Sequence, residues 1–170
     1  MRSIAKLFSI SIVVLLFASN AFSQVTASAT ASATIVTPIA ITKDTDMNFG
    51  NLAVNATVGT VVLTPAGARS ATGGVSFLAA SPGTITAASF TVTGIAGATY
   101  SITLPAGSIT ITSGANTMTV DNFTSSPTPT GTLTGGTETL NVGATLNVGA
   151  SQAPGTYISG TPFDVTVNYN

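Results

Sequence analysis

The sequence contains no cysteine, no histidine and no tryptophan, and only 5% of its 170 residues are charged. Without cysteine the chain lacks the disulfides that stabilise many small secreted domains, so its stability must come from hydrophobic packing and backbone pairing. Without histidine and cysteine it also lacks the commonest general base, the thiol nucleophile and the usual transition-metal ligands. These absences argue against an enzyme, and no cofactor or metal is expected.

Basic residues are also scarce. Beyond residue 23 the only ones are Lys43 and Arg69. Five acidic residues stand against them: Asp44, Asp46, Asp121, Glu138 and Asp164. This balance offers no basic surface for nucleic acid or anionic lipid, so we expect no nucleic-acid partner.

The five carboxylates are scattered, and no two are marked as the acid and base of a hydrolase. A serine nucleophile would need Lys43 or Arg69 to activate it. Asp44 and Asp46 form the one local acidic cluster. They could contribute oxygen atoms to a Ca²⁺ site, but such a site needs about six to eight oxygen ligands. The favoured interpretation is a charged turn whose aspartates bond to their own backbone.

Threonine, serine, alanine, glycine and valine dominate the chain. Threonine and valine are β-branched and favour the pleated surface of a sheet, whereas strong helix formers are rare after residue 23. The 17 glycines and 8 prolines provide turns. The composition predicts an all-β fold with a single domain after the leader.

Residues 1–23 have the pattern of a signal peptide. Arg2 and Lys6 precede an apolar stretch from Ile10 to Phe17, and Ala21 and Ser23 are the small residues that a signal peptidase reads. We therefore expect cleavage before Gln24 and export, through the periplasm to the cell surface or beyond. An uncleaved anchor is the alternative, although the apolar stretch is short for a bilayer and no later stretch could span one.

The segment Val25–Ile35 alternates strictly between apolar and hydroxyl side chains, as a strand with one buried face would. Most of its apolar residues are alanines. It is interpreted as an N-terminal extension, residues 24–34, that is either a strand or a flexible linker. The apolar positions within it are Val25, Ala27, Ala29, Ala31 and Ala33.

Short strands separated by turns are predicted along residues 35–170. The expected strands are Ile35–Thr42, Met47–Val54, Thr57–Thr64, Val75–Ala80, Ser89–Ile95, Thr99–Leu104, Ser108–Thr112 and Thr117–Phe123. Breaks are expected at residues 65–67, 73–74, 81–83 and 105–107, and a long surface loop at 125–131.

Two C-terminal segments have the clearest patterns. Leu140–Ala144 recurs as Leu146–Ala150, which predicts one long strand with glycine kinks, since two copies are too few for a solenoid. The last segment places four large apolar groups on one face, and it predicts a core strand at the end of the chain. These residues are Phe163, Val165, Val167 and Tyr169.

Gly155–Gly160 followed by Val165–Tyr169 resembles the C-terminal signature of chaperone–usher pilins and spore-coat-U-like domains. Met47–Leu52 resembles the hydrophobic-Phe-Gly strand near the start of those domains. From about Ile35 to Asn170 the chain is similar to a family of secreted bacterial domains named only as domain of unknown function 4402. The resemblance implies an immunoglobulin-like, pilin-like antiparallel β-sandwich.

The pilin resemblance further implies a sandwich that lacks one strand and is completed by a neighbour's N-terminal extension. Here Val25–Ile35 would be the donor, and the acceptor groove would lie beside Phe163–Tyr169. The implied partners are further copies, other surface subunits or an assembly chaperone. Alternatives remain: Val25–Ile35 pairs within its own domain, or the protein is a stand-alone binding module such as a glycan-binding adhesin.

Overall fold

The computed structural model describes residues 24–170, so the predicted leader lies outside the described residues. The chain divides at Ile35, and a domain follows from Val36 to Asn170. Residues 24–35 form no strand, and every side chain in this segment is exposed. The segment with alternating apolar and hydroxyl side chains is therefore extended, and it is not the first strand of the domain's sheet.

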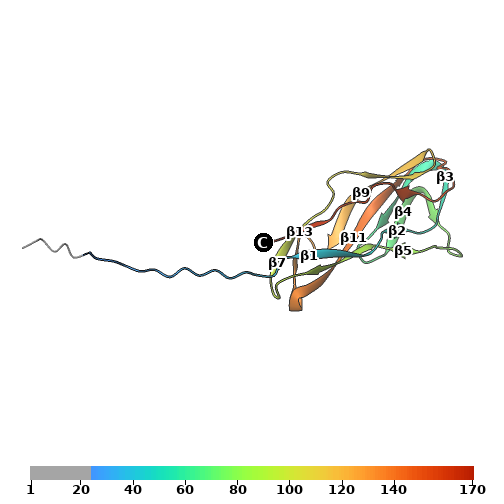
Figure 1. Cartoon of the computed structure of the whole chain (residues 1–170). Helices are drawn as coiled ribbons and strands as arrows, with labels where there is room; N and C mark the ends of the chain where they lie inside the picture. Colours follow the sequence, from blue (N-terminus) through green and yellow to red (C-terminus); the bar gives the residue numbers. More distant parts are fainter. Residues whose placement is uncertain (1–23) are drawn as a thin grey trace, which may run out of the picture. The chain divides into compact units, whose positions relative to one another are not determined.

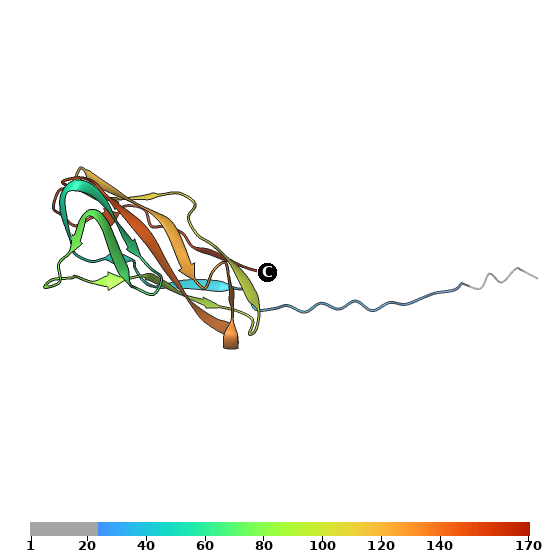
Figure 2. The same cartoon turned by 180° about the vertical axis from the view of Figure 1, so that it is seen from behind.

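The domain is all-β, as the composition predicts (Figures 1 and 2). One 3₁₀ turn, η1 (Thr134–Gly136), is the only helical element among the described residues. The strands are β1 (Ala40–Thr45), β2 (Asn48–Phe49), β3 (Leu52–Leu63), β4 (Arg69–Phe77), β5 (Ile85–Thr86), β6 (Ala88–Thr93), β7 (Thr99–Thr103), β8 (Ile109–Ser113), β9 (Asn116–Ser126), β10 (Thr130–Thr132), β11 (Thr137–Val148), β12 (Ile158–Ser159) and β13 (Thr166–Tyr169).

The strands form one large antiparallel sheet and two small ones. The large sheet has the order β1-β6-β11-β9-β8-β12, and β3 joins it by pairing with both β11 and β4. A second sheet has the order β10-β7-β13, and β2 pairs with β5 in the third. All the ladders are antiparallel, which explains how short loops can connect most of the strands.

Strand β11 holds the large sheet together and contains most of the sequence repeat. Along one edge it pairs with β6 as far as Val142 and with β3 from Ala144 onward. Gly143 lies at this change of partner, where the carbonyl oxygen of Leu63 approaches so closely that no side chain would fit. A bulge in the facing strand β9, where Asn122 has a φ of 47°, shifts the register at the same level. The sheet curls at this point because its partner strands change there.

The side chains of β11 alternate as predicted, with the apolar set buried from Leu140 to Val148. Ala150, predicted to share that face, is exposed because β11 ends at Val148 and a turn follows. The two copies of the repeat therefore have different surroundings, although their sequences are the same.

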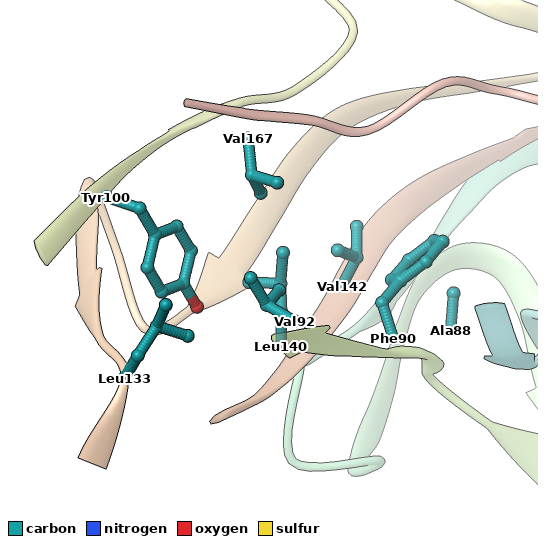
Figure 3. Close-up of a cluster of buried hydrophobic side chains, with 8 residues drawn as sticks. All are labelled: Ala88, Phe90, Val92, Tyr100, Leu133, Leu140, Val142 and Val167. Atoms are coloured by element: carbon teal, nitrogen blue, oxygen red, sulfur yellow. The ribbon is translucent and has the colours of Figure 1, made fainter. Parts of the chain in front are cut away.

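The core consists of two clusters that both use β11. The first lies between the large sheet and the sheet β10-β7-β13, and it includes Tyr100, Leu140 and Val167 (Figure 3). The second contains Val61 and Leu146 and lies among β3, β4, β8, β9 and the C-terminal half of β11. The two sheets are thus joined mainly by the packing of the first cluster, since no ladder links them.

The strand predictions are correct for most elements and wrong in four places. Two strands, Met47–Val54 and Thr57–Thr64, were predicted where β3 runs unbroken from Leu52 to Leu63 and the short β2 precedes it. Residues 73–74, predicted as a break, lie inside β4, which runs from Arg69 to Phe77 and not from Val75 to Ala80. The predicted loop at 125–131 is shorter, because β9 continues to Ser126 and β10 begins at Thr130. The first strand of the domain begins at Ala40 and not at Ile35.

The repeat provides a matched pair of variants that tests the partner change at β11. A methyl group at position 143 would meet the backbone of Leu63 and Pro65, whereas one at position 149 would meet only the end of the Gln152 side chain. We expect Gly143→Ala to lower the free energy of unfolding by about 2–3 kcal/mol. Gly149→Ala is expected to change it by no more than about 0.5 kcal/mol. Urea unfolding measures both, and equal effects would contradict this account of the curl.

Candidate functional site

The first and last strands of the domain, β1 and β13, each keep one edge without a partner. β1 ends the large sheet and pairs only with β6, and β13 ends the sheet β10-β7-β13 and pairs only with β7. Among the described residues, no strand pairs with the second edge of either. Figures 1 and 2 both show β1, β7 and β13 gathered at one end of the domain. The backbone N–H and C=O groups on these two edges are available to another chain.

Tyr169 fixes the end of β13 next to the start of β1. Its hydroxyl accepts a hydrogen bond from the amide of Ile95 at 2.7 Å and donates one to the carbonyl oxygen of Thr37 at 3.1 Å. Thr37 lies just before β1, and Tyr169 is the last residue of β13. The end of one strand is therefore beside the beginning of the other, so the two edge strands run in opposite directions.

The predicted terminal core strand lies at this site. Val167 is buried against the first cluster, with 7% of its surface exposed, and Phe163, Val165 and Tyr169 are half-buried on the same face. Over residues 163–169, half-buried or buried side chains alternate with exposed ones. Pairing is shorter than predicted, because only Thr166–Tyr169 are bonded to β7.

Half-buried apolar side chains line both free edges. Ile39 and Ile41 pack against the first cluster from the side of β1, and Val165 packs against it from the side of β13. Beneath them Val92 and Leu140 are fully buried. The edges therefore combine unpaired backbone with a shallow apolar surface above a closed core.

The acidic cluster of β1 is a structural feature of this edge. Asp46 lies in the turn after β1 and forms an ion pair with Lys43 at 2.7 Å, while Asp44 accepts a hydrogen bond from the Thr91 hydroxyl at 2.8 Å. The predicted bonds to their own backbone are not formed. Among residues 24–170, no three acidic side chains come together as metal ligands.

Arg69 contacts backbone carbonyl groups and no carboxylate. Its guanidinium donates to the carbonyl oxygens of Phe49 and Asn51 and lies 4.1 Å from the centre of the Phe77 ring. This arrangement connects β4 to the small sheet of β2 and β5. From the sequence, Arg69 could be identified only as one of two cations. The carbonyl groups that it contacts come together through folding, and the sequence contains no local pattern for them.

Tyr100 lies in the first cluster, and its side chain is fully buried. Burial raises the pKa of its hydroxyl above the usual value, and the neighbouring carboxylate of Glu138 acts in the same direction. The Glu138 carboxylate itself accepts a hydrogen bond from the amide of Thr132 at 2.7 Å. The hydroxyl therefore stays neutral at physiological pH and behaves as part of the core.

The predicted donor residues lie in the extended segment. Val25 has 91% of its surface exposed and Ile35 has 99%, and the alanines between them are all exposed. The apolar face predicted for Val25, Ala27, Ala29, Ala31 and Ala33 is thus uncovered in the single chain.

Together these features define an all-β domain with a curled antiparallel sheet whose first and last strands each keep a free edge. The chain belongs to the family described as Domain of unknown function (DUF4402), which matches residues 39–169. This match confirms the resemblance of the sequence to the DUF4402 family. No curated protein and no solved structure matches the chain. Within the described residues, no helix is both long enough and apolar enough to cross a membrane.

The hydrogen bonds of the Tyr169 hydroxyl are the feature of this site that the sequence did not reveal, because their partners are distant in the chain. We expect Tyr169→Phe to lower the free energy of unfolding by about 1–3 kcal/mol, since it leaves the Ile95 amide and the Thr37 carbonyl without this partner. Hydrogen exchange should also become faster at the amides of β13.

Tyr157→Phe is the matched control, because the Tyr157 hydroxyl also makes two hydrogen bonds, to Gln152 and Ala153, away from β13. It should lower stability without a selective effect on β13. Unchanged exchange of β13 in Tyr169→Phe would show that this hydroxyl does not hold the edge strand in place.

Proposed function

We propose that this chain is an exported, non-enzymatic subunit of a bacterial surface assembly, joined to its neighbours by donation of a β-strand. The observation that carries the proposal is the pair of free edges on β1 and β13, with half-buried apolar side chains between them. We interpret the domain as an immunoglobulin-like sandwich of pilin type with one strand position open. The other subunits of the assembly are copies of this chain or related surface proteins, with an assembly chaperone during transit of the periplasm.

The direction of the two edge strands determines how a donated strand would pair. Because β1 and β13 run in opposite directions, an inserted strand is antiparallel to one and parallel to the other. A strand antiparallel to β13 would form the more stable ladder with the last strand of the chain. It would also cover Ile41 and Val165, which are half-buried now.

The segment Val25–Ile35 has suitable chemistry for that position. It is extended, contains no proline, and presents small apolar side chains at every second residue. Val92 and Leu140 already close the core beneath the edges, so a covering strand does not need large side chains to fill it. Alanines at positions 27–33 would therefore add a covering layer without displacing the core.

The way in which the extension connects to β1 favours strand donation between molecules over pairing within one molecule. The extension joins the domain directly before β1, at the end where β13 finishes. A strand from the same molecule that ran antiparallel to β13 would have to run parallel to β1, and such a connection must cross the length of β1. Residues 36–39 are too few for that crossing, whereas a strand from a second molecule has no such constraint.

Removing the extension tests this proposal. We expect the mature chain from Gln24 to form species whose size grows with concentration in light scattering, while a version that starts at Thr34 stays monomeric. An excess of the peptide Gln24–Thr34 should block the growth and raise the thermal stability of the shortened version, because binding to the native state stabilises it.

Two peptides with the same added charge provide the control. Ala29→Asp places a carboxylate on the apolar face of the peptide and should abolish its effect, because a buried charge without a partner is costly. Thr30→Asp places it on the polar face and should leave most of the effect. If both protein versions remain monomeric and equally stable at every concentration, the extension is a linker and the proposal is wrong.

A further inference from the structure

The β7–β13 ladder stops where proline enters it. Thr103 pairs with Thr166, and two residues further along that register Pro105 would stand opposite Asp164. Proline has no N–H to donate, so the ladder ends and the two segments separate. Between them lies a shallow, open cleft of about 350 Å³, lined on one side by residues 103–105 and 107–109 and on the other by residues 162–164 and 166.

The lining of this cleft combines one aromatic ring with polar groups that have no partner in the domain. Phe163 lies on the lining, and its ring centre is 5.0 Å from that of Phe123, which supports it from the core side. Asp164 is exposed beside it. The hydroxyl groups of Thr103, Ser108 and Thr166 complete the lining, and in residues 24–170 neither they nor the Asp164 carboxylate makes a side-chain hydrogen bond or ion pair.

We propose that this cleft binds a saccharide unit that carries no negative charge. A sugar ring has an apolar C–H face, which packs on an aromatic ring, and hydroxyl groups at its edge, which donate to a carboxylate and exchange hydrogen bonds with hydroxyls. The cleft offers that combination, and its volume is at the small end of the range of ligand pockets, suited to one ring. Neither Lys43 nor Arg69 lines it, so phosphorylated and sulfated ligands lack a cationic partner and would be repelled by Asp164.

This site is independent of strand donation. A donated strand would pair with the free edge of β13, whereas the cleft opens on the other side, where β13 separates from the continuation of β7. Saccharide binding can therefore be tested on the shortened version from Thr34 as well as on the mature chain, and failure of one proposal leaves the other standing.

Nuclear magnetic resonance of ¹⁵N-labelled mature protein gives a direct test. Glucose, galactose, mannose and glucosamine are titrated separately into the tens-of-millimolar range. We expect saturable shifts for at least one of them, confined to amides of residues 103–109 and 162–166, with a dissociation constant in the millimolar range. Asp164→Ala should weaken this binding about tenfold or more, which corresponds to about 1.4 kcal/mol.

A filled cleft gives a second and independent variant. Gly107 lines the cleft, and a Cβ atom there would meet no protein atom within 4 Å, so Gly107→Leu should block binding while the fold is retained. Gly160→Leu adds the same group in open space outside the lining, and Asp46→Ala removes an exposed carboxylate just after β1. Both variants should bind as the unmodified protein does. The proposal is overturned if none of the four sugars gives saturable shifts, or if Asp164→Ala and Gly107→Leu bind as tightly as the controls.

Discussion

The fold depends on the change of partner along β11. One edge of this strand pairs with β6 in its first half and with β3 in its second half, while β9 covers the other edge. Its inward side chains supply both core clusters, from Leu140 in the first to Val148 in the second. Gly143 makes this possible, because only a residue without a side chain allows the end of β3 to approach the strand so closely. The curl of the large sheet brings the sheet β10-β7-β13 over the first cluster.

The same arrangement leaves the first and last strands of the domain side by side without pairing. Tyr169 bridges Thr37 and Ile95, so the end of β13 is held beside the start of β1. Exposed edges of this kind promote uncontrolled association unless they are protected. Charged side chains at Lys43 and Asp46 provide some of that protection on β1. A specific donated strand would provide the rest.

Much of the fold could be predicted from the sequence because the alternation of residues depends only on which face of a strand is buried. The burial of side chains follows this alternation in Leu140–Val148 and in Phe163–Tyr169. The order of the strands and the free edges could not be predicted, since they depend on pairing between distant segments. Glycine was misleading in one place: a break was predicted at Gly73 and Gly74, but they lie in β4 opposite a bulge of β3, where close backbone contact excludes side chains.

Cross-linking tests most directly the central claim that the extension of one molecule pairs with β13 of another. The chain has no cysteine of its own, so only the introduced cysteines can form a disulfide. A copy with Ser28→Cys, Thr30→Cys or Ser32→Cys is mixed with a copy carrying Asn168→Cys on β13, and disulfide formation is measured under mild oxidation. Neighbouring strands bring Cα atoms within the roughly 4.4–6.8 Å that a disulfide requires, so we expect efficient mixed dimers with at least one of the three. Thr139→Cys, exposed on β11 where that strand pairs with β6, should give few. Equal yields with Asn168→Cys and Thr139→Cys, or none with either, would contradict strand donation at β13.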